Sequence, residues 1–110
     1  MQHQAPNLFT GGAVAPGTEQ FTTLLERDGT RIERIVSNEH SSPEGFWYDQ
    51  PEDEWVLLVA GEAVLDFVDA GAPLHLKAGD HVFIPRHVRH RVLSTSPQAV
   101  WLAIHLAAAP

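Results

Sequence analysis

Short apolar runs separated by turn residues fill the chain from Phe21 onward, with turn signals about every eight to twelve residues. This spacing predicts a sandwich or barrel of antiparallel strands, and no segment carries the apolar stripe of an amphipathic helix. The Asp28-Gly29 pair predicts a tight hairpin turn. The predicted strands cover residues 21–26, 31–37, 46–48, 54–60, 62–68, 74–77, 81–85, 90–94 and 99–106.

Two of these strands, 54–60 and 99–106, are apolar at both odd and even positions. A strand with one face in water alternates between polar and apolar residues instead. The outer face of both strands therefore needs a cover, which a second sheet, the N-terminal segment or a second subunit would supply. We expect a homodimer that uses one of these faces.

The composition describes a globular domain of 110 residues that is 44% hydrophobic. We expect an N-terminal arm over residues 1–17 and a single barrel domain over 18–110. The chain has no cysteine, which excludes disulfides and thiolate chemistry. A net charge of −7 argues against nucleic acid as a partner, and no apolar run is long enough to span a membrane. No signal peptide is apparent, so the cytoplasm is the simplest location.

Two sequence motifs, in order, give the chain its family resemblance. Glu54 is followed after six residues by Gly61, and Gly79 is followed after five residues by Pro85 and then by His90. In these spacings the chain resembles the cupin family, and specifically the small single-domain bacterial cupins. The resemblance implies an all-β jelly-roll barrel of about eight antiparallel strands, with Glu54 and His90 pointing into it.

The chain departs from the cupin pattern at the histidine pair of the first motif. With a four-residue spacer those positions are Trp47 and Asp49, and with a three-residue spacer they are Tyr48 and Gln50. In the second motif, His87 and Ser94 stand where the family has glycine and asparagine. The missing histidine pair bears directly on metal binding.

Cupins bind a divalent metal through that histidine pair, the glutamate and the second-motif histidine. By resemblance Glu54 and His90 remain as ligands here, and Asp49 or Gln50 would supply a third, with water or His105 as a fourth. Carboxylate, amide and imidazole donors suit Zn, Mn, Fe or Ni. For Glu54 the plainer alternative is a pair with an arginine, and for His90 and His105 it is a hydrogen-bonded core histidine.

Other residues are candidates for contact with a substrate. His105 or Tyr48 would be the base that moves a proton. Trp47 would stack on a ligand, although large aromatic residues more often fill a core. Three arginines gather within six residues, which would attract an anionic small molecule or else form a rim balanced by nearby acids. These are Arg86, Arg89 and Arg91.

Several functions fit this pattern, because the cupin fold does not fix a reaction. The first is a metal-dependent enzyme on a small polar or anionic molecule, in one form a sugar or sugar-phosphate isomerase like the phosphomannose isomerases, which share the barrel. A dioxygenase is a second form of this hypothesis. The alternatives are a binding domain with weak or no metal, and a structural dimerisation module.

Overall fold

The computed structural model describes residues 4–108, so the predicted arm and domain extend beyond the described residues at the two ends. Every regular element within this range is a strand, and no helix there could cross a membrane. The strands are β1 (Thr18–Arg27), β2 (Thr30–Asn38), β3 (Asp53–Ala60), β4 (Glu62–Phe67), β5 (Leu74–Lys77), β6 (His81–Ile84), β7 (His90–Thr95) and β8 (Ala99–Leu106).

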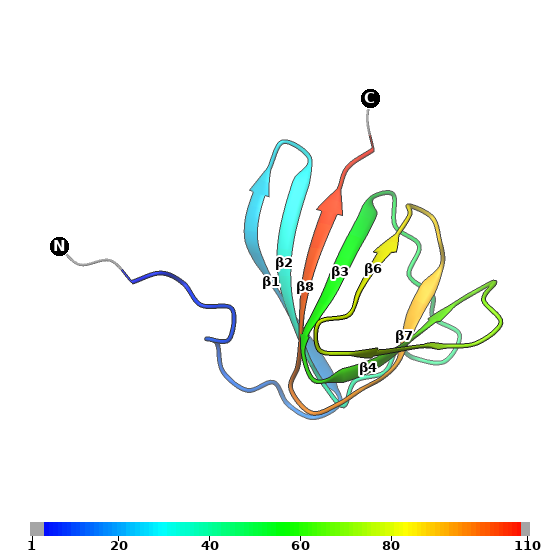
Figure 1. Cartoon of the computed structure of the whole chain (residues 1–110), viewed down its shortest axis with the longest axis horizontal. Helices are drawn as coiled ribbons and strands as arrows, with labels where there is room; N and C mark the ends of the chain where they lie inside the picture. The colour runs from blue at the N-terminus through cyan, green and yellow to red at the C-terminus, as the bar shows by residue number, and fades with distance from the viewer. Residues whose placement is uncertain (1–3, 109–110) are drawn as a thin grey trace.

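The strands form two sheets that face each other. One sheet has the order β1-β2-β8-β3-β6 and the other has the order β5-β4-β7, with antiparallel pairing throughout. Figure 1 shows the five strands of the larger sheet side by side, from β1 at the left to β6 at the right, with β4 and β7 of the smaller sheet at the lower right. The predicted all-β fold of eight antiparallel strands is confirmed. The predicted strand 46–48 is wrong as a regular element, because only an isolated bridge from Tyr48 to His90 forms there.

The Asp28-Gly29 turn joins β1 to β2 as predicted. Asp28 has a φ of 46° and Gly29 a φ of 81°, the pair of positive values that a type I′ turn requires. This turn matches the twist of the two strands that it connects, and it sets their register from Arg27 to Leu25, beyond which the register shifts at an irregularity between Thr23 and Leu25.

Alternation along the strands places the core between the two sheets. On β3, Val56 and Leu58 are buried, and on β8, Trp101 and Ala103 are buried. The second sheet contributes further side chains to the same cluster, among them Leu65. The polar residues Glu54 and His105 lie on this inner face too, at the end of each strand away from the β3–β4 turn.

The outer face of the five-stranded sheet carries an apolar row across all five strands. Cross-strand pairing aligns Leu25, Ile32, Ile104, Trp55 and Phe83 from β1 to β6. Leu25 and Phe83 are exposed, and the other three are half-buried. We name these five residues the outer row.

The N-terminal segment covers a different part of that outer face. The guanidinium of Arg34, on β2, donates to the backbone carbonyls of Leu8 and Thr10, and Asn38 Nδ2 donates to the Val14 carbonyl at 2.8 Å. The N-terminal segment, one of the three possible covers named in the sequence analysis, therefore covers the outer face near Arg34 and Asn38. The outer row has no such cover among residues 4–108.

Gly61, the glycine of the first motif, forms the tight β3–β4 turn at the end of the barrel away from Glu54. Its φ is +90°, and an added Cβ would lie 2.6 Å from Ser96 Oγ and 3.0 Å from Ala99 Cα. Ser96 Oγ also accepts a hydrogen bond from the Glu62 N–H at 2.9 Å. The turn therefore has room for no side chain.

We expect Gly61→Ala to lower the free energy of unfolding by about 2 to 4 kcal/mol, through backbone strain and displacement of Ser96. Urea denaturation measures this loss. Gly71→Ala is the matched control, because nothing lies within 4 Å of an added Cβ there. Equal stability of the two variants would contradict the steric explanation.

Candidate functional site

A cavity lies between the sheets at the end of the barrel where Glu54 and His90 meet, and we name it the barrel pocket. It contains about 530 Å³ of space free of protein atoms, including its opening to solvent. Most of this space belongs to the opening, because the part that water-sized molecules can occupy is about 70 Å³, below the usual range of about 300 to 1,000 Å³ for small-molecule sites. The pocket is lined by Glu19, Phe21, Glu33, Ile35, Tyr48, Gln50, Glu54, Val56, Leu65, Ile84, His90, Val92, Trp101 and His105.

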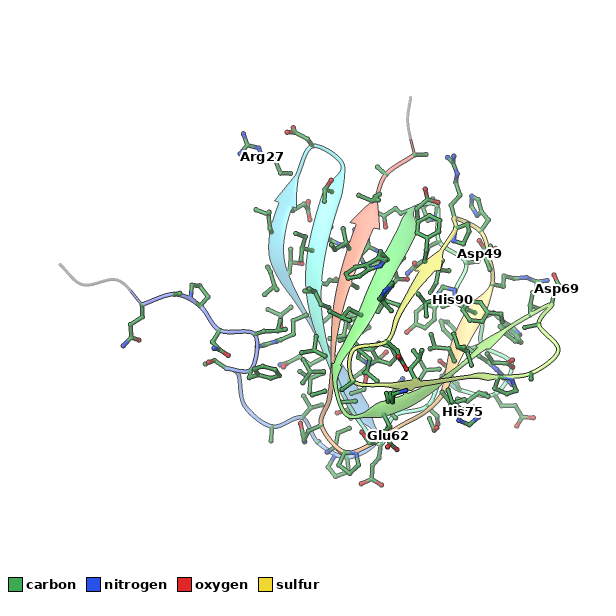
Figure 2. The ribbon with its side chains drawn as sticks, viewed as in Figure 1. Arg27, Asp49, Glu62, Asp69, His75 and His90 are labelled. Carbon is green, nitrogen blue, oxygen red and sulfur yellow. The ribbon has the colours of Figure 1, made fainter. Side chains whose placement is uncertain are left out.

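The strands deliver the polar residues of the pocket from both sheets. Glu54 on β3 stands in register with His105 on β8, and Glu33 lies on β2, the strand that pairs with β8 on its other side. His90 begins β7 in the opposite sheet. In Figure 2 the labelled His90 lies toward the upper part of the barrel, whereas Glu62 marks the opposite end.

Glu54 and His90 face each other across the pocket. His90 Nε2 lies 3.7 Å from Glu54 Oε1, and the two side chains are only 7% and 9% exposed. His90 Nδ1–H donates to the Val88 carbonyl at 2.9 Å, which fixes the ring and leaves Nε2 toward the acid. The Tyr48 ring stacks on the His90 ring, with centroids 5.4 Å apart.

The pKa of Glu54 is raised above its ordinary value. Burial is the main cause, because it removes water from the carboxylate. The imidazoles of His105 and His90 oppose this rise, and the negative charge of Glu33 adds to it. A carboxyl group with a raised pKa in a partly apolar cavity is suited to take and return a proton.

His105 is held by acids on both sides. Its Nε2–H donates to Glu33 Oε1 at 3.0 Å, and its Nδ1 lies 3.9 Å from Glu52 Oε1. Arg31 forms two hydrogen bonds of 3.2 Å with Glu52 and lies 3.7 Å from Glu33. His105 Nδ1 is buried and has no hydrogen-bond partner among the described residues. Because Nε2 is bonded to Glu33 and Nδ1 is shielded, the ring lines the pocket without offering a nitrogen to a ligand.

Tyr48 is tied to a second acid at the pocket. Its hydroxyl donates to Glu19 Oε1 at 3.1 Å. Glu19 is also 3.4 Å from both His40 Nε2 and Ser37 Oγ. Burial and the neighbouring Glu19 raise the pKa of Tyr48 well above its usual range, so its hydroxyl stays protonated at neutral pH and cannot act as a base.

The structure brings together some of the residues that the sequence nominated and leaves others apart. Tyr48, Gln50, Glu54, His90 and His105 all line the barrel pocket. Tyr48 and Gln50 are the histidine-pair positions given by the three-residue spacer, so the inward-facing register is that one. The alternative pair, Trp47 and Asp49, does not line the pocket.

Asp49 and Trp47 make other contacts. Asp49 Oδ1 lies 2.8 Å from His87 Nδ1 in a largely exposed pair. The Arg91 guanidinium lies 4.7 Å from the centre of the Trp47 ring, and its Nε is 3.6 Å from Asp66. Arg86 and Arg89 are exposed. None of the three arginines lines the pocket.

Sequence reasoning missed Glu19, Glu33 and His40. The His40 side chain is only 16% exposed and lies against Glu19. Glu33 is two residues from Ile35, and strand period places both on one face. That spacing was the available signal, but it becomes informative only once the inner face of β2 is known.

The side chains available in the pocket do not form the divalent metal site that the cupin motifs imply. Among residues 4–108, no group of three or more His, Cys, Asp or Glu side chains is arranged to hold a metal ion. His105 Nε2 donates to Glu33, and the Tyr48 hydroxyl donates to Glu19. Glu54, His90 and the Gln50 amide are left, whereas a tight site needs at least three strong protein donors.

Comparison with known proteins defines the class. The two-sheet barrel with its interior pocket is the jelly-roll architecture, and the family model described as "Cupin domain" matches residues 33–105. The chain therefore belongs to the cupin family. No functionally curated protein matches it.

Three solved structures illustrate the likeness. A candidate mannose-6-phosphate isomerase from Ralstonia eutropha is 45% identical, with a TM-score of 0.90, over 96% of this chain and 100% of that one. A cupin superfamily protein from Desulfitobacterium hafniense is 21% identical, with a TM-score of 0.72, over 86% and 83%. An RmlC-like cupin from Shewanella frigidimarina is 18% identical, with a TM-score of 0.72, over 98% and 93%. The last two share the fold alone.

Proposed function

We propose that this cupin binds a small hydroxy-carbonyl compound in the barrel pocket and isomerises it by proton transfer. The observation that carries the proposal is the buried pair of Glu54 and His90, whose facing atoms lie 3.7 Å apart in a cavity that reaches solvent. The name of the Ralstonia relative points to the same class of reaction, the movement of a proton between adjacent carbons.

Glu54 and His90 have different roles in such a reaction. The Glu54 carboxylate takes the proton from the hydroxyl-bearing carbon, and the protonated imidazole of His90 gives its Nε2 proton to the neighbouring carbonyl oxygen, which forms an enediol. Glu54 then returns its proton to the former carbonyl carbon, and His90 Nε2 takes the proton of the original hydroxyl, so that both groups regain their starting state. The Val88 carbonyl orients that imidazole, and apolar side chains make up most of the cavity wall around the enediol. Tyr48 and His105 support the pair by packing and charge, because their own polar atoms are engaged or shut off from the cavity.

The reaction needs no resident metal in this form, in keeping with the donor set described above. A metal, where a cupin holds one, polarises the carbonyl oxygen. The dioxygenase hypothesis depends on metal ligands more strongly and receives no support from this donor set. The alternative that remains is a cupin that binds a small molecule without converting it.

One experiment separates the isomerase from the binding protein. Untagged protein, dialysed against chelator, is incubated in D2O with mannose 6-phosphate, fructose 6-phosphate and the two unphosphorylated sugars. Proton NMR then follows deuterium entry at the carbon next to the carbonyl. Enzyme-dependent exchange supports the proposal. Its absence with all four sugars, and with the amino sugar glucosamine in the same assay, contradicts isomerisation and leaves the binding protein.

We also propose that two copies associate through the outer row. A continuous row of apolar side chains on the outer face of a sheet is typical of a protein–protein interface. We expect a dimer at micromolar concentration by light scattering, and we expect Phe83→Lys to weaken association at least about tenfold, because it buries a charge at the interface. Phe9→Lys, at an exposed phenylalanine of the N-terminal segment, is the control. A monomeric wild type would contradict the proposal.

A further inference from the structure

The barrel pocket is acidic, and this limits the ligands that it accepts. Its lining includes three carboxyl side chains, from Glu19, Glu33 and Glu54, and among the described residues no lysine or arginine lines it. The whole chain carries a net charge of −7. A cleft lined with one sign of charge attracts ligands of the opposite sign.

The three acids differ in what neutralises them. Glu19 has the Tyr48 hydroxyl, at 3.1 Å, and His40 against it. Glu33 accepts a hydrogen bond from His105 at 3.0 Å and has Arg31 at 3.7 Å. Both acids are thus partnered within the protein.

Glu54 is not partnered in this way. Its carboxylate accepts no hydrogen bond from any described residue, although the side chain is only 9% exposed. The nearest basic atom, His90 Nε2, is 3.7 Å away, beyond hydrogen-bond distance. A buried carboxylate without a donor costs free energy, and a ligand that donates to it would recover that cost.

The rest of the lining suits a compact organic cation. The aromatic residues Tyr48 and Trp101 are among those that line the cavity, and aromatic rings attract ammonium groups. The arginines that a phosphate would need are elsewhere, since Arg31 pairs with Glu52 and Arg91 with Asp66. A phosphorylated ligand would place its dianion among three carboxyl groups.

We propose that the ligand of the barrel pocket carries a protonated amino group that donates to Glu54, so that the substrate is an amino-substituted hydroxy-carbonyl compound and not a phosphorylated one. One carboxylate oxygen accepts from the ammonium group, and the other stays free for the proton transfer described above. The carbonyl group of the ligand follows from the proposed function, on which this part of the inference rests. The preference for a positive charge rests only on the residues that line the pocket.

Three probes with one hexose body test the charge preference: glucosamine, glucose and glucose 6-phosphate. Binding to chelator-treated protein is followed by NMR of the histidine imidazoles and by titration calorimetry. We expect glucosamine to bind at least about tenfold more tightly than glucose, and glucose 6-phosphate to bind more weakly than either. Equal binding of glucosamine and glucose, preference for the phosphate, or no binding of glucosamine would each overturn the inference.

Variants locate the effect. Glu54→Gln should reduce the glucosamine preference to about that of glucose, and Glu19→Gln, which keeps Glu54, should reduce it only in part. Glu44→Gln, at an exposed glutamate, removes the same charge and should leave it unchanged. Equal loss in all three variants would show a general effect of net charge and overturn the assignment to Glu54.

A metal ion is the competing cation. Zn²⁺ that binds stoichiometrically at submicromolar concentration and displaces glucosamine would overturn the inference in favour of a metal site. The proposed isomerisation is judged separately, since its exchange assay also uses neutral and phosphorylated sugars. Exchange without a glucosamine preference would defeat only the inference drawn here.

Discussion

Glu54→Gln is expected to lower the rate of deuterium exchange by a factor of about 10² to 10⁴, the usual contribution of a positioned acid or base. Glutamine keeps the size of the side chain but cannot accept the carbon-bound proton. NMR exchange rates for wild type and variant measure the effect. A rate within about threefold of wild type would remove Glu54 from the mechanism.

The same substitution should stabilise the fold at neutral and alkaline pH. Because burial raises the pKa of Glu54, the folded protein holds this proton more tightly than the unfolded chain does. The stability that the neutral form provides is complete below the unfolded pKa and is lost as the pH rises through the folded value. Glutamine resembles the neutral form at every pH.

We therefore expect Glu54→Gln to gain on the order of 1 kcal/mol at about pH 8, or roughly 4 °C in Tm, and almost nothing at about pH 4. Thermal melts of both proteins at the two pH values test this. A gain of equal size at both pH values would show that the effect does not come from ionisation. A loss at about pH 8 would contradict the assigned direction of the pKa.

The second large effect is a contrast between the two histidines of the pocket. His90→Asn should lower the exchange rate by about 10² to 10⁴, because Nε2 is the nitrogen that faces Glu54. His105→Asn should lower it by about tenfold or less, because Nε2 is bound to Glu33 and Nδ1 is buried away from the cavity.

The stability of the two variants should rank in the opposite order. His105→Asn removes the donor to Glu33 and should cost about 1 to 3 kcal/mol, measured by urea denaturation. His90→Asn removes one side-chain hydrogen bond, to the Val88 carbonyl, together with the ring stacking on Tyr48, and we expect a smaller loss. If His105→Asn were the slower enzyme, His105 and not His90 would be the acid.

The sequence predicted most of the fold because strand alternation and turn chemistry are local. The strand at 54–60 and the strand at 99–106 agree with β3 and β8 to within one residue, and the Asp28-Gly29 hairpin forms. The strand expected at 46–48 fails because Tyr48 forms only a bridge to His90 and the segment has no continuous partner. A partner strand is a tertiary property that the sequence of one segment does not contain.

The site was less predictable, and for a related reason. The motif spacing nominated Glu54 and His90, but it left two registers open for the residues before Glu54. Only the folded chain shows Tyr48 and Gln50 facing inward. Glu19 and Glu33 enter the pocket through the pairing of β1, β2 and β8, which has no signature in any short window. The arginines near residue 90 are close in sequence to the site, yet Arg91 turns to Asp66.

The segment between β2 and β3 contributes Tyr48 and Gln50 to the pocket and forms one β-bridge, at Tyr48. Separate hydrogen bonds also tie it to β7, among them Ser42 N–H to the Val92 carbonyl and His40 N–H to Thr95 Oγ1. The two sheets close without it, since every ladder of the fold joins other residues. This loop is therefore the natural place to graft new specificity. Its length and side chains can be exchanged by an engineer, or by evolution, while the scaffold that holds Glu54 stays intact.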